Sequence, residues 1–349
     1  MKLVKRFTAL VGAGVLSMAL CACSIREGKT KGILISSAVE NETIDMGPDV
    51  SGEDFTGYRV GVSLYNCTLN TYCTSYVQAL NETMAEYEVD TAVFDAFGDP
   101  GQQAAQIKTL ISMGVDLIIL WPSDSNLAVS WVQSVSEAGI PVVVANTNVS
   151  PEGEQYVEGF VGPSGVEEGY QTACRMLMDL EGRGNIVVLN GPDNYEPARE
   201  RRKGLKDAIT GTKINIIEEY SDVGGQRSLS RTYMEECLKN HPIGEIDAVF
   251  CYDDEAALGA FDAMSLMNRS GEMKVYVAAS GNYDIMSYIE EGMVAASVIQ
   301  SPIVDARTTV NYALSILKGN ELPDYYNYIS TPIVDAENVR ALNLSLWQS

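Results

Sequence analysis

The sequence contains very little histidine and few basic residues. Among its 349 residues there is one histidine, His241, and 24 lysines and arginines stand against 47 aspartates and glutamates, which gives a formal net charge of −23. A nucleic-acid-binding protein needs a basic face for the phosphate backbone, so a nucleic-acid partner is not expected. The acidity favours solubility. With a single histidine and no nucleophile elbow, a serine–histidine–aspartate hydrolase has no support.

Motifs for phosphates and metals are also missing. The chain has no GxGxxG and no GxxxxGK[ST] stretch to cradle a nucleotide. Its cysteines form no CxxC pair, so neither a structural zinc site nor any other metal or cofactor is predicted. Cys67 and Cys73 lie six residues apart in one predicted loop. They form either a disulfide, if the compartment is oxidising, or two free thiols.

The N-terminus has the features of an export signal. Three cations precede an apolar run from Phe7 to Leu20, which has the length of a signal-peptide core and is too short to span a bilayer as a mature helix. The stretch Leu20-Cys21-Ala22-Cys23 resembles a bacterial lipobox, with leucine three residues before the lipidated cysteine. We therefore expect residues 1–22 to be a signal peptide and Cys23 to carry the lipid. An ordinary cleaved signal peptide is the alternative.

Residues 23–56 are rich in serine, glycine and acidic residues and show no sustained periodicity. This composition predicts an acidic, solvated, flexible tether. The expected location is extracytoplasmic, with the protein lipid-anchored to the bacterial membrane at the cell surface or in the periplasm.

From Tyr58 onward, short runs rich in β-branched residues alternate with amphipathic stretches. Strands are predicted at 59–64, 91–94, 117–120, 141–144, 185–189, 215–218, 248–250, 275–277 and 295–299. Helices are predicted at 75–87, 102–113, 127–138, 169–180, 197–209, 228–239, 256–267, 285–291 and 305–318. The alternation predicts an α/β fold with two doubly wound parallel-sheet lobes. Ligands of such sheets bind beyond the C-terminal ends of the strands, here in the cleft between the lobes.

The loops after the predicted strands mix aromatic, amide, carboxyl and hydroxyl side chains. A sugar site requires aromatic and polar side chains together, since the apolar face of the sugar stacks on an aromatic ring and its hydroxyls pair with planar polar groups. The candidate ligand-binding residues are Tyr65, Asn66, Asn70, Tyr72, Trp121, Asn146, Asn148, Tyr195, Arg199, Asp253, Ser280 and Gln300. Each also has a structural interpretation, as a packing residue, a loop anchor, a helix cap or an ion-pair partner.

From about Tyr58 to Val339 the chain resembles the periplasmic sugar-binding proteins of the ribose/galactose type. Five stretches carry the resemblance in order: 114–124 (GVDLIILWPSD), 138–143 (AGIPVV), 197–204 (PARERRKG), 248–260 (AVFCYDDEAALGA) and 298–302 (VIQSP). The resemblance implies a periplasmic binding protein of type I, whose lobes are joined by a three-crossing hinge. It places the N-terminal lobe at 57–162 plus 301–329 and the C-terminal lobe at 163–300 plus 330–349.

The resemblance also assigns roles to single residues. It places Asn70 and Tyr72 where the family has an amide and an aromatic residue in the first loop. Trp121 stands where ribose binders have an asparagine, and Arg199 matches an arginine that reaches the ligand from the second lobe. Asp253 matches a polar contact and Gln300 a glutamine at a lobe crossover, while Asp254-Glu255 would cap the following helix.

The chain departs from the ribose-binding pattern at two places. Asn146-Thr147 replaces an Asp-Arg pair, and Ala279-Ser280 replaces a Phe-Asp pair. Several groups that hold ribose are therefore missing, and a ligand other than ribose is indicated.

These features predict a substrate-binding lipoprotein for sugar transport. It would capture a small polar ligand, in the first place a sugar, by lobe closure, deliver it to an ABC permease and act as a monomer. An enzyme is not expected, because the only acid–base candidates, Asp253 and Asp254, are adjacent and point apart. The alternatives are a receptor module that reports ligand to a membrane kinase or chemoreceptor, and a binder of a nucleoside or a sugar-like signal. A DNA-binding repressor would need a helix-turn-helix where this chain has the lipobox.

Overall fold

The computed structural model describes residues 44–221 and 225–341, all of which belong to one compact unit. The predicted signal peptide, Cys23 and most of the predicted tether lie outside the described residues. Lipidation at Cys23 therefore stays a prediction.

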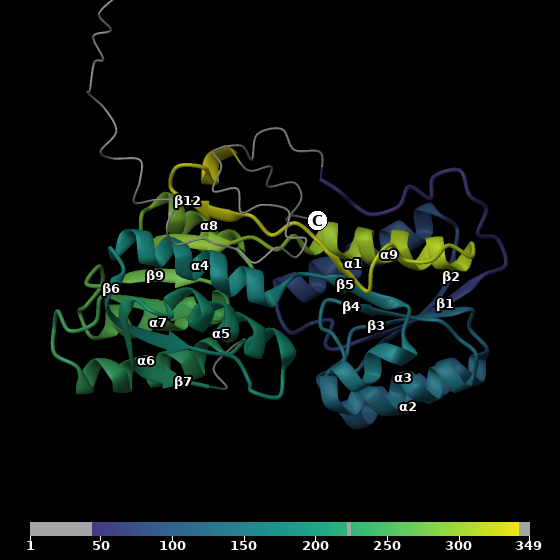
Figure 1. The fold of residues 1–349 in the computed structure, drawn as a ribbon, viewed down its shortest axis with the longest axis horizontal. Helices are drawn as coiled ribbons and strands as arrows, with labels where there is room; N and C mark the ends of the chain where they lie inside the picture. Colours follow the sequence, from purple (N-terminus) through teal and green to yellow (C-terminus); the bar gives the residue numbers. More distant parts are fainter. Residues whose placement is uncertain (1–43, 222–224, 342–349) are drawn as a thin grey trace, which may run out of the picture. The chain divides into compact units, whose positions relative to one another are not determined.

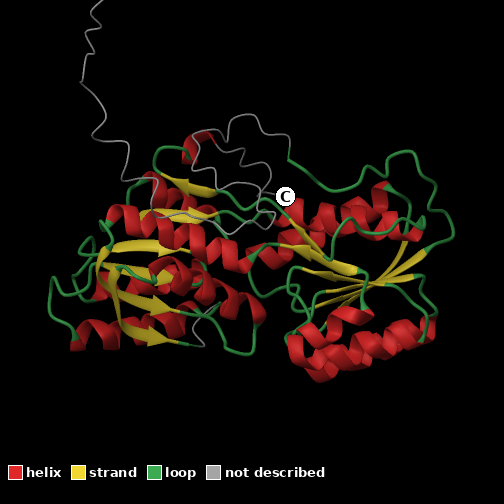
Figure 2. Cartoon of the chain, viewed as in Figure 1, coloured by secondary structure: helices red, strands yellow, loops and turns green. Residues whose placement is uncertain are grey.

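The described chain builds two sheets of six strands each (Figures 1 and 2). The first has the order β11-β5-β4-β3-β1-β2 and is parallel throughout. Its strands are β1 (Arg59–Leu64), β2 (Asp90–Asp95), β3 (Leu117–Leu120), β4 (Val142–Ala145), β5 (Gly159–Gly162) and β11 (Tyr326–Tyr328). The second has the order β12-β10-β9-β8-β6-β7. Its strands are β6 (Arg183–Leu189), β7 (Lys213–Tyr220), β8 (Ala248–Cys251), β9 (Lys274–Val277), β10 (Val294–Val298) and β12 (Ile333–Asp335).

Helices cover both faces of each sheet. The central strands carry apolar side chains on both sides, and all of these are buried. On the first sheet, α1 (Thr71–Glu86) and α9 (Pro302–Leu317) pack on one face, and α2 (Pro100–Met113) and α3 (Ser125–Glu137) on the other (Figure 1). On the second, α4 (Gly165–Asp179) and α5 (Glu196–Ile209) pack on one face. Its other face carries α6 (Arg227–Asn240), α7 (Asp254–Leu266) and α8 (Tyr283–Glu290). Two 3-10 helices, η1 (Pro151–Tyr156) and η2 (Val339–Ala341), complete the assignment.

The predicted α/β fold with two doubly wound sheets is confirmed, with corrections in detail. Strand β12 runs antiparallel to β10, so the second sheet is not parallel at that edge. Three short strands, β5, β11 and β12, were not predicted. Helix α1 begins at Thr71 rather than Ser75, because the side chain of Asn70 accepts a hydrogen bond from the Cys73 amide and caps the helix there.

The chain passes between the two sheets three times. It does so between β5 and α4, between β10 and α9, and between β11 and β12. At the first passage a Cβ on Gly162 would lie 2.9 Å from the backbone nitrogen of Asn146, so only glycine fits there. We call the first sheet with α1, α2, α3 and α9 the first lobe, and the second sheet with α4 to α8 the second lobe.

The expectation of a solvated tether reaching residue 56 is wrong for the part that the structure describes. Val50 and Phe55 are buried in the core beside α1 and α9. Asn311 on α9 donates a hydrogen bond of 3.0 Å to the Met46 carbonyl oxygen. The Phe55 ring packs edge-on against Tyr87, with 5.8 Å between centroids. The buried Val50 and Phe55, together with the hydrogen bond from Asn311, thus hold this segment against the first lobe.

Candidate functional site

An aromatic group lies at the C-terminal ends of the strands of the first sheet. Trp121 directly follows β3 and is only 4% exposed. Its ring packs edge-on against Tyr76, at 5.0 Å between centroids, and against Tyr72, at 6.2 Å. Both tyrosines belong to α1, which starts after the loop that follows β1. The predicted loop residues Tyr72 and Trp121 therefore do come together.

A polar network surrounds the hydroxyl of Tyr72. This hydroxyl donates to Asp305 Oδ2 at 2.6 Å and accepts from Gln300 Nε2 at 2.6 Å and from Asn146 Nδ2 at 3.1 Å. Asn146 also donates to Asp305 at 2.6 Å. Burial raises the pKa of Asp305 to about 6, and burial together with the Asp305 charge raises the pKa of Tyr72 well above its usual value. The network brings a carboxylate, two amides and a phenol to one place.

Tyr195 reaches this group from the second lobe. Its hydroxyl accepts hydrogen bonds from Thr147 Oγ1 at 2.8 Å and from Trp121 Nε1 at 3.4 Å. Its ring lies 5.7 Å from that of Tyr65, between centroids. Four predicted aromatic residues, Tyr65, Tyr72, Trp121 and Tyr195, thus form one group that joins the two lobes.

A buried ion pair supports the second lobe behind Gln300. Arg201 Nε donates to Glu168 at 2.8 Å, and Arg201 Nη2 donates to Gln300 Oε1 at 3.3 Å. Helices α4 and α5 approach closely because each has a glycine at the contact: a Cβ on Gly169 would lie 2.0 Å from the Arg201 carbonyl oxygen, and one on Gly204 would lie 2.2 Å from a backbone oxygen of α4. Burial raises the pKa of the Glu168 carboxyl, and the adjacent guanidinium opposes that rise.

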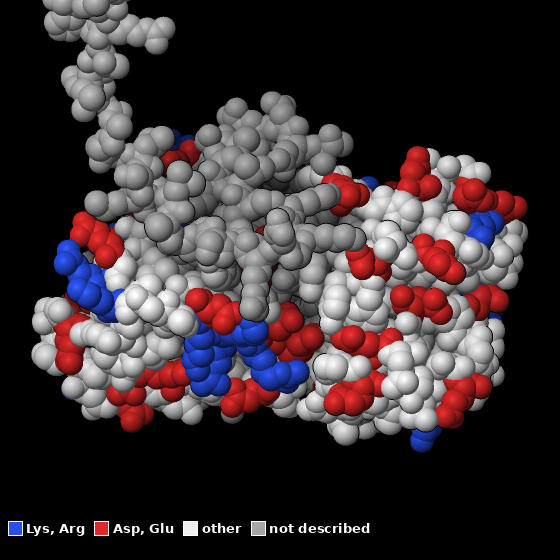
Figure 3. Space-filling view, in the orientation of Figure 1, with Lys and Arg blue, Asp and Glu red and all other residues white. Residues whose placement is uncertain are grey.

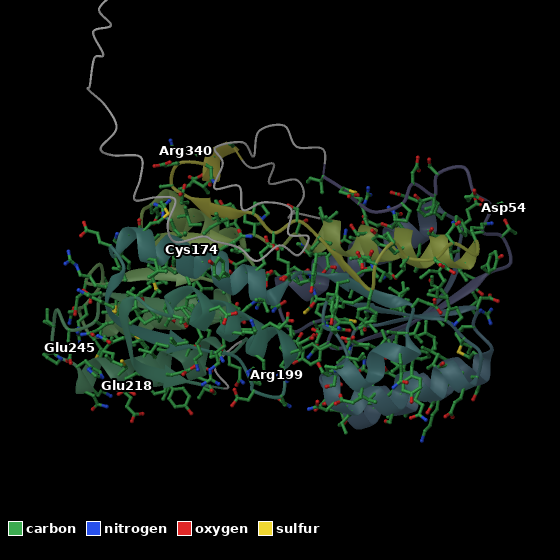
Figure 4. The ribbon with its side chains drawn as sticks, viewed as in Figure 1. Asp54, Cys174, Arg199, Glu218, Glu245 and Arg340 are labelled. Carbon is green, nitrogen blue, oxygen red and sulfur yellow. The ribbon has the colours of Figure 1, made fainter. Side chains whose placement is uncertain are left out.

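Arg199, which the resemblance assigns to the ligand, lies apart from the network. It is exposed and donates to the backbone oxygen of Asp193 at 3.0 Å, in the loop before α5 (Figure 4). Figure 3 shows lysine and arginine side chains gathered over α5, whereas acidic side chains are spread over the rest of that face. Arg199 would have to turn toward the other lobe to meet a ligand.

Asp253, Asp254 and Ser280 form a second polar group at the C-terminal ends of β8 and β9. Asp253 caps α7 through the Ala256 amide, at 2.8 Å, and also accepts from the Gly225 amide, at 2.6 Å. Asp254 is not a cap, contrary to expectation, and instead binds the amides of Ser280, Gly281 and Asn282 and the Ser280 hydroxyl at 2.9–3.1 Å. Burial raises the pKa of Asp253 to about 7.

The remaining predicted residues bond to protein groups: Asn66 and Asn70 to their own loop and helix, and Asn148 also to distant residues. Asn66 accepts from the Thr68 amide at 3.1 Å, and Asn70 caps α1. The Asn148 side-chain oxygen accepts from the Val149 amide and the Tyr325 hydroxyl, and the Asn148 backbone N–H donates to Glu196 at 2.6 Å. The structure has Cys67 and Cys73 as free thiols.

Residues that sequence reasoning missed complete the site. They are Tyr76, Thr147, Glu168, Arg201 and Asp305. All but Thr147 lie within helices, so the search of loops after strands passed over them. The stretch 197–204 that carries the resemblance does contain Arg201, and that signal was available.

The described ranges, 44–221 and 225–341, offer neither a metal-ion cluster nor a membrane-spanning helix. They contain no group of three or more histidine, cysteine or acidic side chains placed to hold a metal ion. None of their helices has both the length and the apolarity needed to cross a membrane.

The model of the periplasmic binding protein domain matches residues 60–321. The chain belongs to the type I periplasmic sugar-binding protein family. Its similarity to the ribose import binding protein RbsB of Bacillus subtilis is 28% identity over 266 residues, covering 76% of this chain and 83% of that protein. The chain is also 28% identical over 319 residues to the putative rhizopine-binding protein of Rhizobium meliloti, a match that covers 89% of this chain and 96% of that protein.

A solved structure shows the same fold. It is an ABC transporter solute-binding protein from Bacillus halodurans with bound myo-inositol, with a TM-score of 0.76 and 28% identity, covering 82% of this chain and 97% of that one. Members of this family are substrate-binding proteins that work outside the cytoplasm. The expected family is confirmed.

Proposed function

We propose that this protein captures a small polyhydroxylated ligand, a sugar or a cyclitol, between its lobes. One observation carries the proposal. Trp121 and Tyr72 stand beside the Asn146–Asp305 polar network at the C-terminal ends of the first sheet, opposite Tyr195 of the second lobe. A ring with one apolar face and several hydroxyls is complementary to an aromatic surface next to carboxylate and amide groups.

The relatives support this chemical class. The Bacillus halodurans protein holds myo-inositol and the Bacillus subtilis relative is a ribose import protein. Ribose itself is the weaker candidate, because Asn146-Thr147 and Ala279-Ser280 replace charged and aromatic residues of the ribose binders. Trp121, which is only 4% exposed here, also replaces the asparagine of the ribose binders.

Capture would proceed by closure of the lobes about the three chain crossings. Gln300 lies at one crossing and contacts both Tyr72 and Arg201, so it links the two halves of the site. A ligand that contacts both halves shifts the population toward the closed form. Micromolar binding corresponds to about −8 kcal/mol, which several hydrogen bonds and one packed ring supply net of the cost of closure.

The proposed cellular role is delivery of the ligand to an ABC permease, with the protein held at the membrane by a lipid on Cys23. No catalysis is assigned, because the oxygens of Asp253 and Asp254 are engaged by backbone amides rather than by each other. A sensor role would use the same closure and differs only in the partner. An ATPase assay on a reconstituted transporter distinguishes delivery from sensing. A delivery protein with bound ligand stimulates the ATPase activity, and a sensor does not.

Isothermal titration calorimetry on the mature protein tests the binding step. The panel is myo-inositol, D-ribose, D-allose, xylitol and a nucleoside, and we expect saturable micromolar binding of at least one polyol or sugar. Trp121→Ala should weaken that binding by more than about tenfold, or about 1.4 kcal/mol. Tyr87→Ala, at the far end of α1, serves as the aromatic control and should leave affinity unchanged.

The same titration tests Arg199. Arg199→Ala should also weaken binding by more than about tenfold, whereas Lys203→Ala, one turn further along α5 and also exposed, should not. Unchanged affinity in either the Trp121 or the Arg199 variant removes that residue from the site. No binding by any sugar or polyol contradicts the proposed ligand class.

A further inference from the structure

One carboxylate of the ligand site has no basic partner. Asp305, in the first turn of α9, is fully buried, and its Oδ2 atom accepts hydrogen bonds from the Tyr72 hydroxyl and the Asn146 amide, both at 2.6 Å. Its other oxygen, Oδ1, is buried and has no hydrogen-bond partner among the residues that the structure describes. A buried carboxylate oxygen without a donor is costly, so a ligand that brings a donor to Oδ1 gains binding energy there.

The other buried carboxylates of the site are compensated within the protein. Glu168 pairs with the guanidinium of Arg201 at 2.8 Å. Asp254 accepts three backbone amides and one hydroxyl from residues 280–282, at 2.9–3.1 Å. Asp305 differs from both, because its donors are a neutral phenol and a neutral amide, and no lysine or arginine of the described chain lowers its pKa.

Asp305 nevertheless stays ionised at neutral pH. Burial raises its pKa only to about 6, because the hydrogen bonds from Tyr72 and Asn146 oppose the effect of burial. The N-terminus of α9 also favours a negative charge at this position. The site therefore holds a buried negative charge that neutral hydroxyl groups do not balance.

The first-lobe half of the site contains no basic side chain. Thr147 stands where the ribose binders have an arginine, and its hydroxyl is hydrogen-bonded to Tyr195 and Trp121 instead. None of the first-lobe residues described above at the site is a lysine or an arginine. Asn146, which donates to Asp305, also lines the cavity between the lobes, so the carboxylate lies directly behind the wall of that cavity. A ligand between the lobes is thus placed to supply the missing positive charge.

We propose that the ligand carries an amine, as an amino sugar or an aminocyclitol does, and that its ammonium group binds Asp305. This inference rests on the proposed function, since it names the substituent by which the site selects among polyhydroxylated ligands. An ammonium group donates up to three hydrogen bonds and brings a full positive charge, whereas a hydroxyl brings one donor and no charge. A hydrogen bond between two charged groups is shorter and stronger than one between neutral groups.

Isothermal titration calorimetry at pH 7 on matched pairs of ligands tests the proposal. In each pair an amine replaces one hydroxyl: D-glucose and D-glucosamine, D-galactose and D-galactosamine, and myo-inositol and 1-amino-1-deoxy-myo-inositol. We expect at least one amine to bind about tenfold more tightly than its neutral partner, or better, because the ionic hydrogen bond replaces a neutral one. This comparison needs no variant and uses the mature protein.

Asp305→Asn locates the effect. It keeps the size of the side chain and removes the charge, so the ratio of the two affinities should fall to about one. Glu321→Gln removes the same charge from an exposed position outside the site and should preserve the ratio.

The outcomes separate this inference from the proposed function. If a neutral sugar or polyol binds and no amine is preferred, or if the preference persists in Asp305→Asn, the inference fails and the proposed function stands. If neither the neutral compounds nor the amines bind, the proposed function itself fails.

Discussion

At the residue scale, Glu196 makes stability depend on pH. Burial, and then repulsion from Glu200, raises its pKa from 4.5 to about 8. Between these two values the folded state binds more protons than the unfolded state, so the free energy of unfolding falls as pH rises from about 4.5 to about 8. Glu196→Gln keeps the acceptor for the Asn148 amide and removes the charge.

We therefore expect Glu196→Gln to stabilise the protein at pH 8.5 relative to the unsubstituted protein, and to have little effect at pH 5. Urea unfolding at the two pH values measures the difference. Glu321→Gln is the matched control, because its carboxylate is exposed. An equal effect of Glu196→Gln at both pH values would contradict the assigned pKa shift.

The closer a site residue lies to the end of a strand, the easier it was to predict from the sequence. Tyr72, Trp121 and Asn146 follow strands of one sheet, so their meeting follows from the α/β pattern alone. Asp305 lies 233 residues from its partner Tyr72, inside a helix on which a buried carboxylate has no local signature. The use of Asp254 to hold the loop 280–282 is equally invisible in sequence, because an acidic residue at a helix start is typical of a cap.

At the scale of elements, the strands that sequence reasoning missed are those that are too short to show a pattern. Strand β5 is four residues with glycine at both ends, and β11 is three residues, Tyr-Asn-Tyr. Neither contains a run of alternating or β-branched residues. They are strands because their neighbours in the sheet supply hydrogen-bond partners. Strand β5 pairs with β4 on one side and β11 on the other, and β11 pairs with β5.

The segment before β1 behaves as an element of the first lobe. Phe55 is 1% exposed and packs against Tyr87, with the Lys318 ammonium 4.8 Å above its ring. Phe55→Ala should lower the free energy of unfolding by about 3–5 kcal/mol, as for other buried phenylalanines. Thr56→Ala, at the exposed next position, should change it by less than about 0.5 kcal/mol.

Urea denaturation of both variants measures these values. If Phe55→Ala is as stable as Thr56→Ala, the segment does not pack on the lobe in solution, and the tether reaches residue 56 after all.

At the scale of the whole molecule, a single chain that crosses three times makes each lobe from distant parts of the sequence. The first lobe takes α9 and β11 from the C-terminal third, and β12 returns to the second lobe. The two-lobe fold was predictable because the strand–helix rhythm is regular from Tyr58 onward. The antiparallel direction of β12 was not, since it is set by the third crossing rather than by the three residues of the strand.

The last prediction concerns lobe closure. Because the proposed ligand contacts both lobes, saturation with the panel member that binds most tightly should decrease the radius of gyration measured by small-angle X-ray scattering. Ligand at one hundred times Kd should also raise the free energy of unfolding by about 2.7 kcal/mol, whether or not the lobes move. Stabilisation without compaction would therefore mean that the ligand binds to one lobe, or to lobes that are already closed. With binding weakened about tenfold in Trp121→Ala, the same ligand concentration is about ten times the variant's Kd, so the stabilisation should fall to about 1.4 kcal/mol rather than vanish.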